Sequence, residues 1–423
     1  MCCEWHCLSD RLNCSEGLRA HSNTRLRFRS FWHDSALQFR SRSIGDLTDA
    51  RVLPGTVKCL LDIQHHGKEH NEREAKNLHV LIVQYQTLNM PTLPRIALIL
   101  TGGTIDSVGK DRLDNAWYIE TEKRLGDGEL LRQIPELNDI AEVHEIPFRR
   151  LPSHALVDKD WLDLLRTVHS IVENGQADGV VITHGTNTIE ETAYFLNLTL
   201  KTDKPVVLVG SMRPASAMSA DGYLNLFNAV KVAADPESRG RGCLVVMNDT
   251  IFHARDVTKN ATYRVDAFVS RDLGPLGFAD NDGKIVFYHQ PLRKHTVATE
   301  FDARQFESLP RVDIVLSYVG ADGTMIEAAA TAGAKGIVSA ATGAGRPTPA
   351  EDAALDKVFK EKGIVICVCS RVASGRIGRS PGLIKRGLVA GDNLQPWKAR
   401  VLLSLALTRT NDPDAIQRMF ETY

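Results

Sequence analysis

The sequence predicts an α/β protein with two domains: a larger N-terminal domain built on a doubly wound, mostly parallel sheet, and a smaller C-terminal α/β domain. Short apolar runs rich in β-branched residues recur along most of the 423-residue chain, as expected of strands buried in a parallel sheet. Segments with a helical period separate these runs, which favours a sheet covered by helices. A charged stretch without a strand-like run, residues 291–310, divides the chain, so we expect domains at 94–290 and 311–423 joined by this linker.

Seven apolar runs are the predicted strands. Most of them end at glycine or a small polar residue, which is typical of strands buried on both faces. The runs are RIALIL (95–100), DGVVIT (178–183), KPVVLV (204–209), GCLVVM (242–247), VDIVLSY (312–318), KGIVSA (335–340) and GIVICV (363–368).

Three segments fit a helical period: TIEETAYFLNLTL (188–200), SADGYLNLFNAVKVAA (219–234) and WKARVLLSLALTR (397–409). The first opens with Thr188 and places Glu191 three residues later. This spacing predicts a capping box, in which the two side chains satisfy backbone N–H groups at the start of the helix.

The first 89 residues differ from the rest of the chain. They show no sustained period of two or of 3.6 residues, and they lack the apolar core of a secretory signal. We expect 1–89 to be a poorly ordered extension. A native chain that lacks this extension would begin at Met90. Cys2, Cys3, His6 and Cys7 have metal-binding side chains, but no paired C-x2-C arms at zinc-site spacing follow, so we predict no metal site.

The composition excludes several classes of protein. A net charge of −1 argues against a strongly basic nucleic-acid binder, and no apolar run reaches the roughly 20 residues of a membrane span. Cys243, Cys367 and Cys369 lie within apolar runs and are predicted to be buried. Because a disulfide framework is not expected in a chain with a large core, we predict a reducing, cytoplasmic compartment.

Polar groups follow three of the predicted strands, at the edge where parallel sheets bind ligands. They are TGGTID (101–106), THGTNT (183–188) and NDT (248–250), the last followed by DVTK (256–259). TGGTID lacks the glycine spacing of nucleotide loops. Two glycines before Thr104 allow a tight turn that presents a hydroxyl, and a threonine hydroxyl becomes a nucleophile only when a base such as tyrosine or a buried lysine activates it. A plain turn is the alternative, and the second hydroxyl-bearing turn with its lysine favours a site.

Longer motifs around these turns resemble the bacterial-type L-asparaginases of the asparaginase/glutaminase family. The motifs are TGGTI (101–105), DGVVITHGTNTIEETAYFLNLT (178–199), GSMRPASAMSADGYLNLFNAV (210–230) and VVMNDTIFHARDVTKNAT (245–262). The likeness runs from about Pro94 to the C-terminus. It implies hydrolysis of the small-molecule amide L-asparagine, with L-glutamine as a lesser substrate, through a threonine acyl-enzyme and without a metal or organic cofactor. It also implies a homotetramer, a dimer of dimers.

The resemblance also implies roles for individual residues. Thr104 matches the nucleophile, and Tyr118 matches a tyrosine on a mobile lid. Thr186 and Lys259 match a second threonine–lysine pair that helps to activate a hydroxyl or water. Ser153 matches the serine that holds the substrate α-carboxylate.

Each of these residues also has a plainer interpretation. Tyr118 follows Trp117, and aromatic pairs are common in cores. Ser153 and His154, which stands where the family commonly has glutamine, lie among turn residues and fit a helix cap. Lys259 fits a solvated surface lysine.

The chain departs from the family pattern at Asn187, where relatives have an aspartate that receives the substrate α-ammonium. A charged hydrogen bond contributes about 1.5–3 kcal/mol and a neutral one about 0.5–1.5 kcal/mol, so we expect weaker selection of the amino group and a lower pKa for Lys259. The span 376–385 also lacks a carboxylate that many relatives extend into a neighbouring subunit's site. We predict that Asp106 partly replaces these groups.

Two other functions remain alternatives. One is the asparaginase-like subunit of a tRNA-dependent amidotransferase, which would need a module for binding its partner. The other is a catalytically weak metabolite-binding protein, suggested by Asn187. Ammonia release from asparagine by the isolated protein separates the three functions.

Overall fold

The computed structural model describes residues 92–423 and two short segments before them, 16–19 and 25–28. These segments are strands β1 (Glu16–Arg19) and β2 (Arg25–Phe28), which pair antiparallel and were not indicated by the sequence pattern. The rest of the expected extension, including the cysteine and histidine cluster at 2–7, lies outside the described residues.

Eight strands form the larger sheet, in the order β12-β11-β8-β7-β6-β5-β3-β4. Strands β4, β3, β5, β6 and β7 run parallel, and β8, β11 and β12 continue the sheet antiparallel. The prediction of a mostly parallel sheet is therefore confirmed. The strand bounds are β3 Arg95–Leu100, β4 Glu142–Pro147, β5 Gly179–Thr183, β6 Val206–Val209, β7 Cys243–Met247, β8 Thr250–His253, β11 Gly277–Ala279 and β12 Ile285–Phe287.

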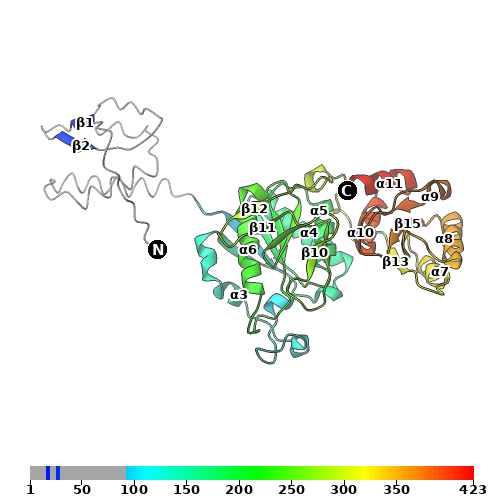
Figure 1. Cartoon of the computed structure of the whole chain (residues 1–423), viewed down its shortest axis with the longest axis horizontal. Helices are drawn as coiled ribbons and strands as arrows, with labels where there is room; N and C mark the ends of the chain where they lie inside the picture. The colour runs from blue at the N-terminus through cyan, green and yellow to red at the C-terminus, as the bar shows by residue number, and fades with distance from the viewer. Residues whose placement is uncertain (1–15, 20–24, 29–91) are drawn as a thin grey trace. The chain divides into compact units, whose positions relative to one another are not determined.

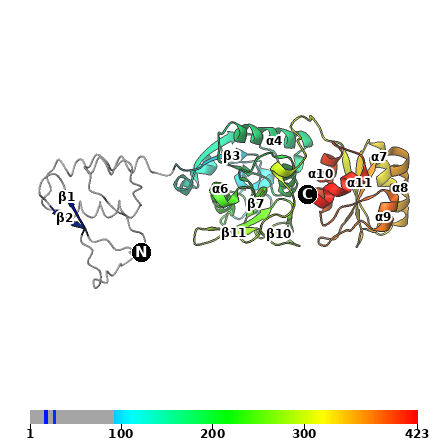
Figure 2. The ribbon, with the colours of Figure 1, turned by 90° about the horizontal axis from the view of Figure 1, so that it is seen from above.

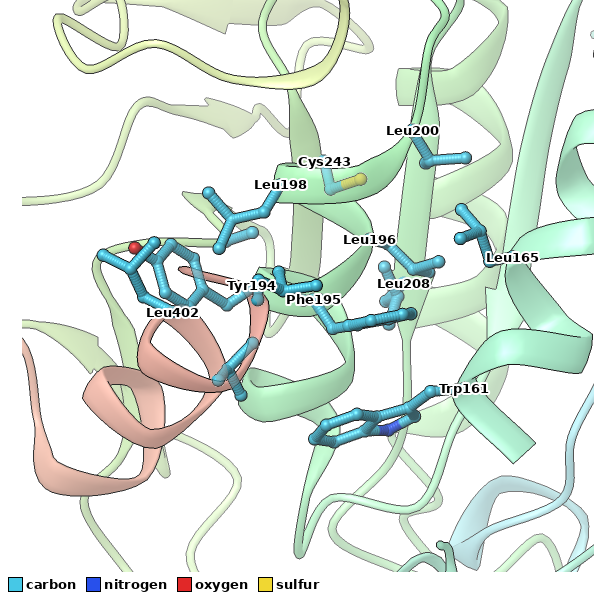
Figure 3. Close-up of a cluster of buried hydrophobic side chains, with 14 of the residues drawn as sticks. Trp161, Leu165, Tyr194, Phe195, Leu196, Leu198, Leu200, Leu208, Cys243 and Leu402 are labelled. Carbon is cyan, nitrogen blue, oxygen red and sulfur yellow. The ribbon is translucent and has the colours of Figure 1, made fainter. Parts of the chain in front are cut away.

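Helices cover both faces of this sheet, so the doubly wound arrangement is confirmed. Alternate residues of β3 enter two different cores: Ala97 and Ile99 pack with α4 (Asp158–Glu173) and α5 (Ile189–Thr199), and Ile96, Leu98 and Leu100 pack with α6 (Gly222–Ala234). This alternation is the period of two of a strand buried on both sides. Figure 3 shows Trp161 of α4 stacked on Phe195 of α5, with ring centroids 5.2 Å apart.

The polar residues after β7 close a hairpin. Asn248 and Asp249 both have positive φ, 51° and 59°, as the two-residue turns that join antiparallel strands require, and β8 returns antiparallel to β7. Their polar groups are used locally: Thr250 donates to the Asn248 carbonyl and Asn228 donates to the Asp249 carboxylate. The prediction that 248–250 delivers groups to the site is therefore wrong.

The smaller sheet has four parallel strands in the order β13-β14-β15-β16. Helices α10 and α11 lie on the side towards the large domain, and α7 and α8 lie on the far side (Figures 1 and 2). Residues 291–310, between the two sheets, contain the short 3-10 helix η7 (Thr296–Ala298). The bounds are β13 Val312–Leu316, α7 Thr324–Thr331, β14 Gly336–Ala341, α8 Pro349–Lys362, β15 Val365–Ser370, α9 Pro381–Arg386, β16 Val389–Ala390, α10 Pro396–Ala406 and α11 Pro413–Thr422.

Helix α10 joins the two domains through a continuous apolar core. Leu402 of α10 belongs to the same buried cluster as Tyr194 and Leu198 of α5, and Figure 3 shows Leu402 beside Tyr194. The three cysteines of the described residues, Cys243, Cys367 and Cys369, are buried free thiols, as predicted. Among the helices of the described residues, none is both long and apolar enough to cross a membrane.

Candidate active site

Two glycine-containing turns leave the neighbouring strands β3 and β5 and pack directly on each other. Gly103 has a φ of 113°, and a Cβ there would lie 2.7 Å from the Gly185 backbone nitrogen. Only glycine therefore permits both the conformation and the contact. The Thr101 hydroxyl donates to the Thr183 carbonyl at 2.6 Å and ties the bases of the two turns together. This contact brings the TGGT and THGT turns to one place, as the strand order predicts.

The first turn presents Thr104 to Tyr118. Their hydroxyl oxygens lie 2.8 Å apart and share a hydrogen bond. Burial raises the pKa of the Tyr118 phenol, so it stays neutral at physiological pH. Trp117 is 68% exposed, which excludes the alternative that the aromatic pair belongs to the core.

Tyr118 lies on a loop that we call the lid, residues 107–124. The lid begins and ends at a bridge between Ser107 and Arg124. The loop after β6 holds the lid from the side: Ala215 N–H donates to the Ser107 carbonyl, and Met218 N–H donates to the Arg112 carbonyl, both at 2.9 Å. These contacts explain why a long motif around 210–220 accompanies the threonine turns, because it orders the loop that carries the tyrosine.

The second turn presents Thr186 to Lys259, which ends the short strand β9 (Val257–Lys259). The lysine ammonium donates to Thr186 Oγ1 at 2.9 Å and to Asn187 Oδ1 at 3.4 Å. Burial lowers the Lys259 pKa, and the Glu190 carboxylate opposes that shift. The lowered pKa is therefore due to burial, and a carboxylate remains nearby in the helix that follows Asn187. The effect of the missing aspartate on this pKa stays a prediction. Lys259 is half-buried and hydrogen-bonded, so the surface-lysine alternative is excluded.

Glu190 and two residues of α10 were missed by the sequence reasoning. Glu190 accepts the Lys259 backbone N–H at 3.1 Å and the Trp397 indole N–H at 2.8 Å. Next to it, the fully buried Lys398 donates to three backbone carbonyls of the segment before Lys259. A lysine at the start of the apolar segment 397–406 was the available signal, because a lysine is buried only when its ammonium has partners.

Ser153 lies beside the second turn. A Cβ on Gly185 would be 2.6 Å from Ser153 Oγ, so the absence of a side chain at 185 lets the serine reach the turn. The Thr188 hydroxyl donates to the Ser153 carbonyl at 2.8 Å and makes no cap bond to α5. The predicted capping box is therefore wrong, because Thr188 fixes the serine loop instead. His154 is exposed.

Asp106 is buried and directed to arginines. Its carboxylate accepts from Arg124 at 2.6 Å and lies 4.0 Å from Arg150. Burial raises its pKa, and the two arginines oppose that shift. A carboxylate already paired in this way is not free for a substrate ammonium group, which argues against the proposed substitution for the missing aspartate. The pair instead ties the turn that carries Thr104 to the end of the lid.

His184, inside the THGT turn, is held neutral. Burial lowers its pKa to about 4, and its Nδ1 lies 2.8 Å from the Gly185 carbonyl. A carbonyl only accepts, so Nδ1 carries the proton. Across the described parts of the chain, no three His, Cys, Asp or Glu side chains gather as a metal site would require.

The chain matches two family models. The model described as "Asparaginase, N-terminal" matches residues 95–293, and the one described as "Glutaminase/Asparaginase C-terminal domain" matches residues 311–420. The chain is 45% identical over 333 residues to a protein of Escherichia coli (strain K12) named L-asparaginase 2, across 78% of this chain and 94% of that protein. It is 42% identical over 335 residues to the glutaminase-asparaginase of Pseudomonas fluorescens biotype A, across 78% and 91%.

A solved structure agrees with these matches. The crystal structure of the probable cytoplasmic L-asparaginase from Campylobacter jejuni superposes with a TM-score of 0.75 at 42% identity, and the match covers 78% of this chain and 100% of that one. The two matched models account for more than half of the chain, and the full length of a solved relative fits it. The chain therefore belongs to the asparaginase/glutaminase family.

Proposed function

We propose that the protein hydrolyses L-asparagine to L-aspartate and ammonia, with L-glutamine as a lesser substrate. The observation that carries the proposal is the pair of adjacent glycine turns, one placing Thr104 on Tyr118 and the other placing Thr186 on Lys259. Named relatives at 42–45% identity support the substrate assignment.

In the proposed reaction, Thr104 Oγ attacks the side-chain amide carbon and loses its proton through the neighbouring hydroxyls. The Tyr118 phenol has a raised pKa, so it relays a proton and does not rest as a phenolate. Lys259 has a lowered pKa and is the better base in the set. Ammonia leaves with the proton, and water then attacks the threonyl ester to release aspartate and restore Thr104. This chemistry uses side chains alone and requires no cofactor.

Substrate recognition is proposed to use Ser153 for the α-carboxylate and Asn187 for the α-ammonium group. Ser153 is supported by its contact with Gly185 in the second turn. Asn187 is exposed beside the Lys259 ammonium and offers one neutral acceptor oxygen. His154, exposed next to Ser153, is proposed to border the same pocket.

Ammonia release from L-asparagine tests the proposed function. Wild-type protein should release ammonia, and Thr104→Ala should lower kcat by about 10³-fold or more. Thr250→Ala is the matched control, because this threonine is bonded within the hairpin turn, and it should keep wild-type activity. Tight binding of asparagine without ammonia release would favour the metabolite-binding alternative, and release only with an added partner would favour the amidotransferase subunit.

We also propose domain boundaries at 94–290 and 311–423 with a linker at 291–310, a homotetrameric assembly and a cytoplasmic location. The family matches at 95–293 and 311–420 support the boundaries. Three buried free thiols support a reducing compartment. Exposed apolar side chains on the edge strand β13 and after it support association between copies; they are Ile314, Leu316, Tyr318, Val319 and Met325.

A further inference from the structure

The first turn of α10 reaches from the C-terminal domain to the segment that carries Lys259. Lys398 is 2% exposed, and its ammonium donates to the carbonyls of Ala254 at 3.0 Å, Arg255 at 2.8 Å and Val257. A buried ammonium is stable only when its three protons are all bonded, and here all three acceptors come from the stretch that leads into β9. One side chain therefore fixes the path of that stretch.

Glu190 holds β9 at its other end, at Lys259. Its carboxylate accepts the Lys259 backbone N–H at 3.1 Å and the Trp397 indole N–H at 2.8 Å, and it lies 4.0 Å from the Lys398 ammonium. Glu190 is also in the first turn of α5, directly after the turn that carries Thr186. The same carboxylate thus connects the turn that carries Thr186, the strand that carries Lys259, and α10.

The hydrogen bond between Lys259 and Thr186 depends on contacts that hold β9 in place. Strand β9 is three residues long and pairs with β10 (Phe268–Ser270), outside the large sheet. A lysine ammonium sits on a flexible stem of four carbons. The 2.9 Å hydrogen bond from Lys259 to Thr186 therefore depends on the position of the Lys259 backbone. A displacement of about 1 Å in catalytic geometry costs about 100-fold in rate.

We infer that Glu190, Trp397 and Lys398 form a positioning cluster that holds Lys259 Nζ on Thr186 Oγ1. This inference rests on the proposed function, and none of the three residues contacts the two hydroxyls that would react. The C-terminal domain therefore contributes to the chemistry of its own subunit's site through α10. The expected signature is a loss of kcat with little change in KM.

Trp397→Phe is the first test, because it keeps the ring and removes only the indole N–H bond to Glu190. We expect kcat for asparagine to fall about tenfold while KM stays within about twofold. Trp161→Phe is the matched control: it removes an equivalent indole bond, to Thr192 at 2.9 Å between α4 and α5, and should leave kcat unchanged. Equal effects of the two variants would overturn the inference.

A double-mutant cycle shows whether the cluster acts through Lys259. Lys259→Met should lower kcat strongly, and adding Trp397→Phe to it should cause no further loss, because the group being positioned is gone. A full additional tenfold loss in the double variant would contradict the inference. If wild-type protein releases no ammonia, the proposed function fails, and the inference is then decided by backbone exchange alone.

Hydrogen–deuterium exchange supplies that independent readout. Lys398→Met removes the three carbonyl contacts, so amides 254–260 should exchange at least about tenfold faster than in wild type. Lys201→Met is the control, because Lys201 makes a similar set of bonds to Thr296 and Thr299 away from the site. If Lys398→Met does not fold, Trp397→Phe is measured instead, with faster exchange of the Lys259 amide expected. Unchanged exchange at 254–260 would contradict the positioning role.

Discussion

The neutral amide of Asn187 is close both to Lys259 and to the proposed binding place of the substrate ammonium group. Its Oδ1 is 3.4 Å from the Lys259 ammonium, so the residue influences both the base and the proposed ammonium pocket. A carboxylate at this position would raise the lysine pKa by favouring its charged form. It would also bind a substrate ammonium about 1–2 kcal/mol more strongly than the amide does. In the proposed site, the amide at position 187 would bind the substrate amino group more weakly than a carboxylate and would leave Lys259 to lose its proton more readily.

The contact between the two glycine turns yields a prediction at a single backbone position. Gly103→Ala should lower kcat/KM about 100-fold or more, since the added Cβ would push the turns apart and move Thr104. Gly283→Ala is the control for the backbone strain alone. Gly283 also has a positive φ, 87°, but a Cβ at this position would meet open space. It should lose about 1 kcal/mol of stability and keep its activity. Equal activity in the two variants would show that the turns tolerate separation.

At the scale of elements, the strands of the parallel sheet were predictable because burial on both faces leaves a continuous apolar run, as in RIALIL and GVVIT. Strand β4 was not, because none of its side chains is buried and its sequence, EVHEIP, forms no continuous apolar run. The residues after β7 were predicted to belong to the site, although Asn-Asp favours the tight turn of a hairpin.

Thr104, Thr186 and Lys259 were predictable from strand ends and motifs. The bond between Glu190 and Trp397 spans 207 residues, and no local pattern encodes it.

Helix α5 carries a half-buried acid, Glu191, whose titration affects stability. Burial raises the pKa of Glu191 to about 7, helped by Glu190 and opposed by Arg400 and Lys398. The unfolded value is about 4.3, so the folded state binds this proton more tightly. The stability due to the neutral form is fully present below about pH 4 and is lost as the pH rises through 7.

Glu191→Gln should therefore be more stable than wild type at pH 8, by up to about 3.6 kcal/mol, and equally stable at pH 4. Denaturant unfolding at the two pH values measures the difference. Glu327→Gln, at an exposed glutamate of α7, is the control and should change stability little at either pH. A gain of the same size at both pH values would show that packing, not titration, is the cause.

For the whole molecule, the exposed apolar side chains at the edge of the small sheet predict self-association. Light scattering coupled to size exclusion should give four times the mass of the chain. Val319→Asp, at a 99% exposed position after β13, should lower that mass, whereas Leu292→Asp, 98% exposed in the segment between the sheets, should not. A monomeric wild-type protein, or equal effects of the two variants, would contradict this surface as the interface.

We propose that the hydrolytic site is intact and that Asn187 alters recognition of the substrate. Steady-state ammonia release from L-asparagine by wild type and Asn187→Asp tests it most directly. We predict that wild type turns over, and that Asn187→Asp lowers KM about tenfold without raising kcat, because the new carboxylate also raises the Lys259 pKa. A wild-type protein without turnover, or a variant with much higher kcat and unchanged KM, would contradict an intact site in which Asn187 alters substrate recognition.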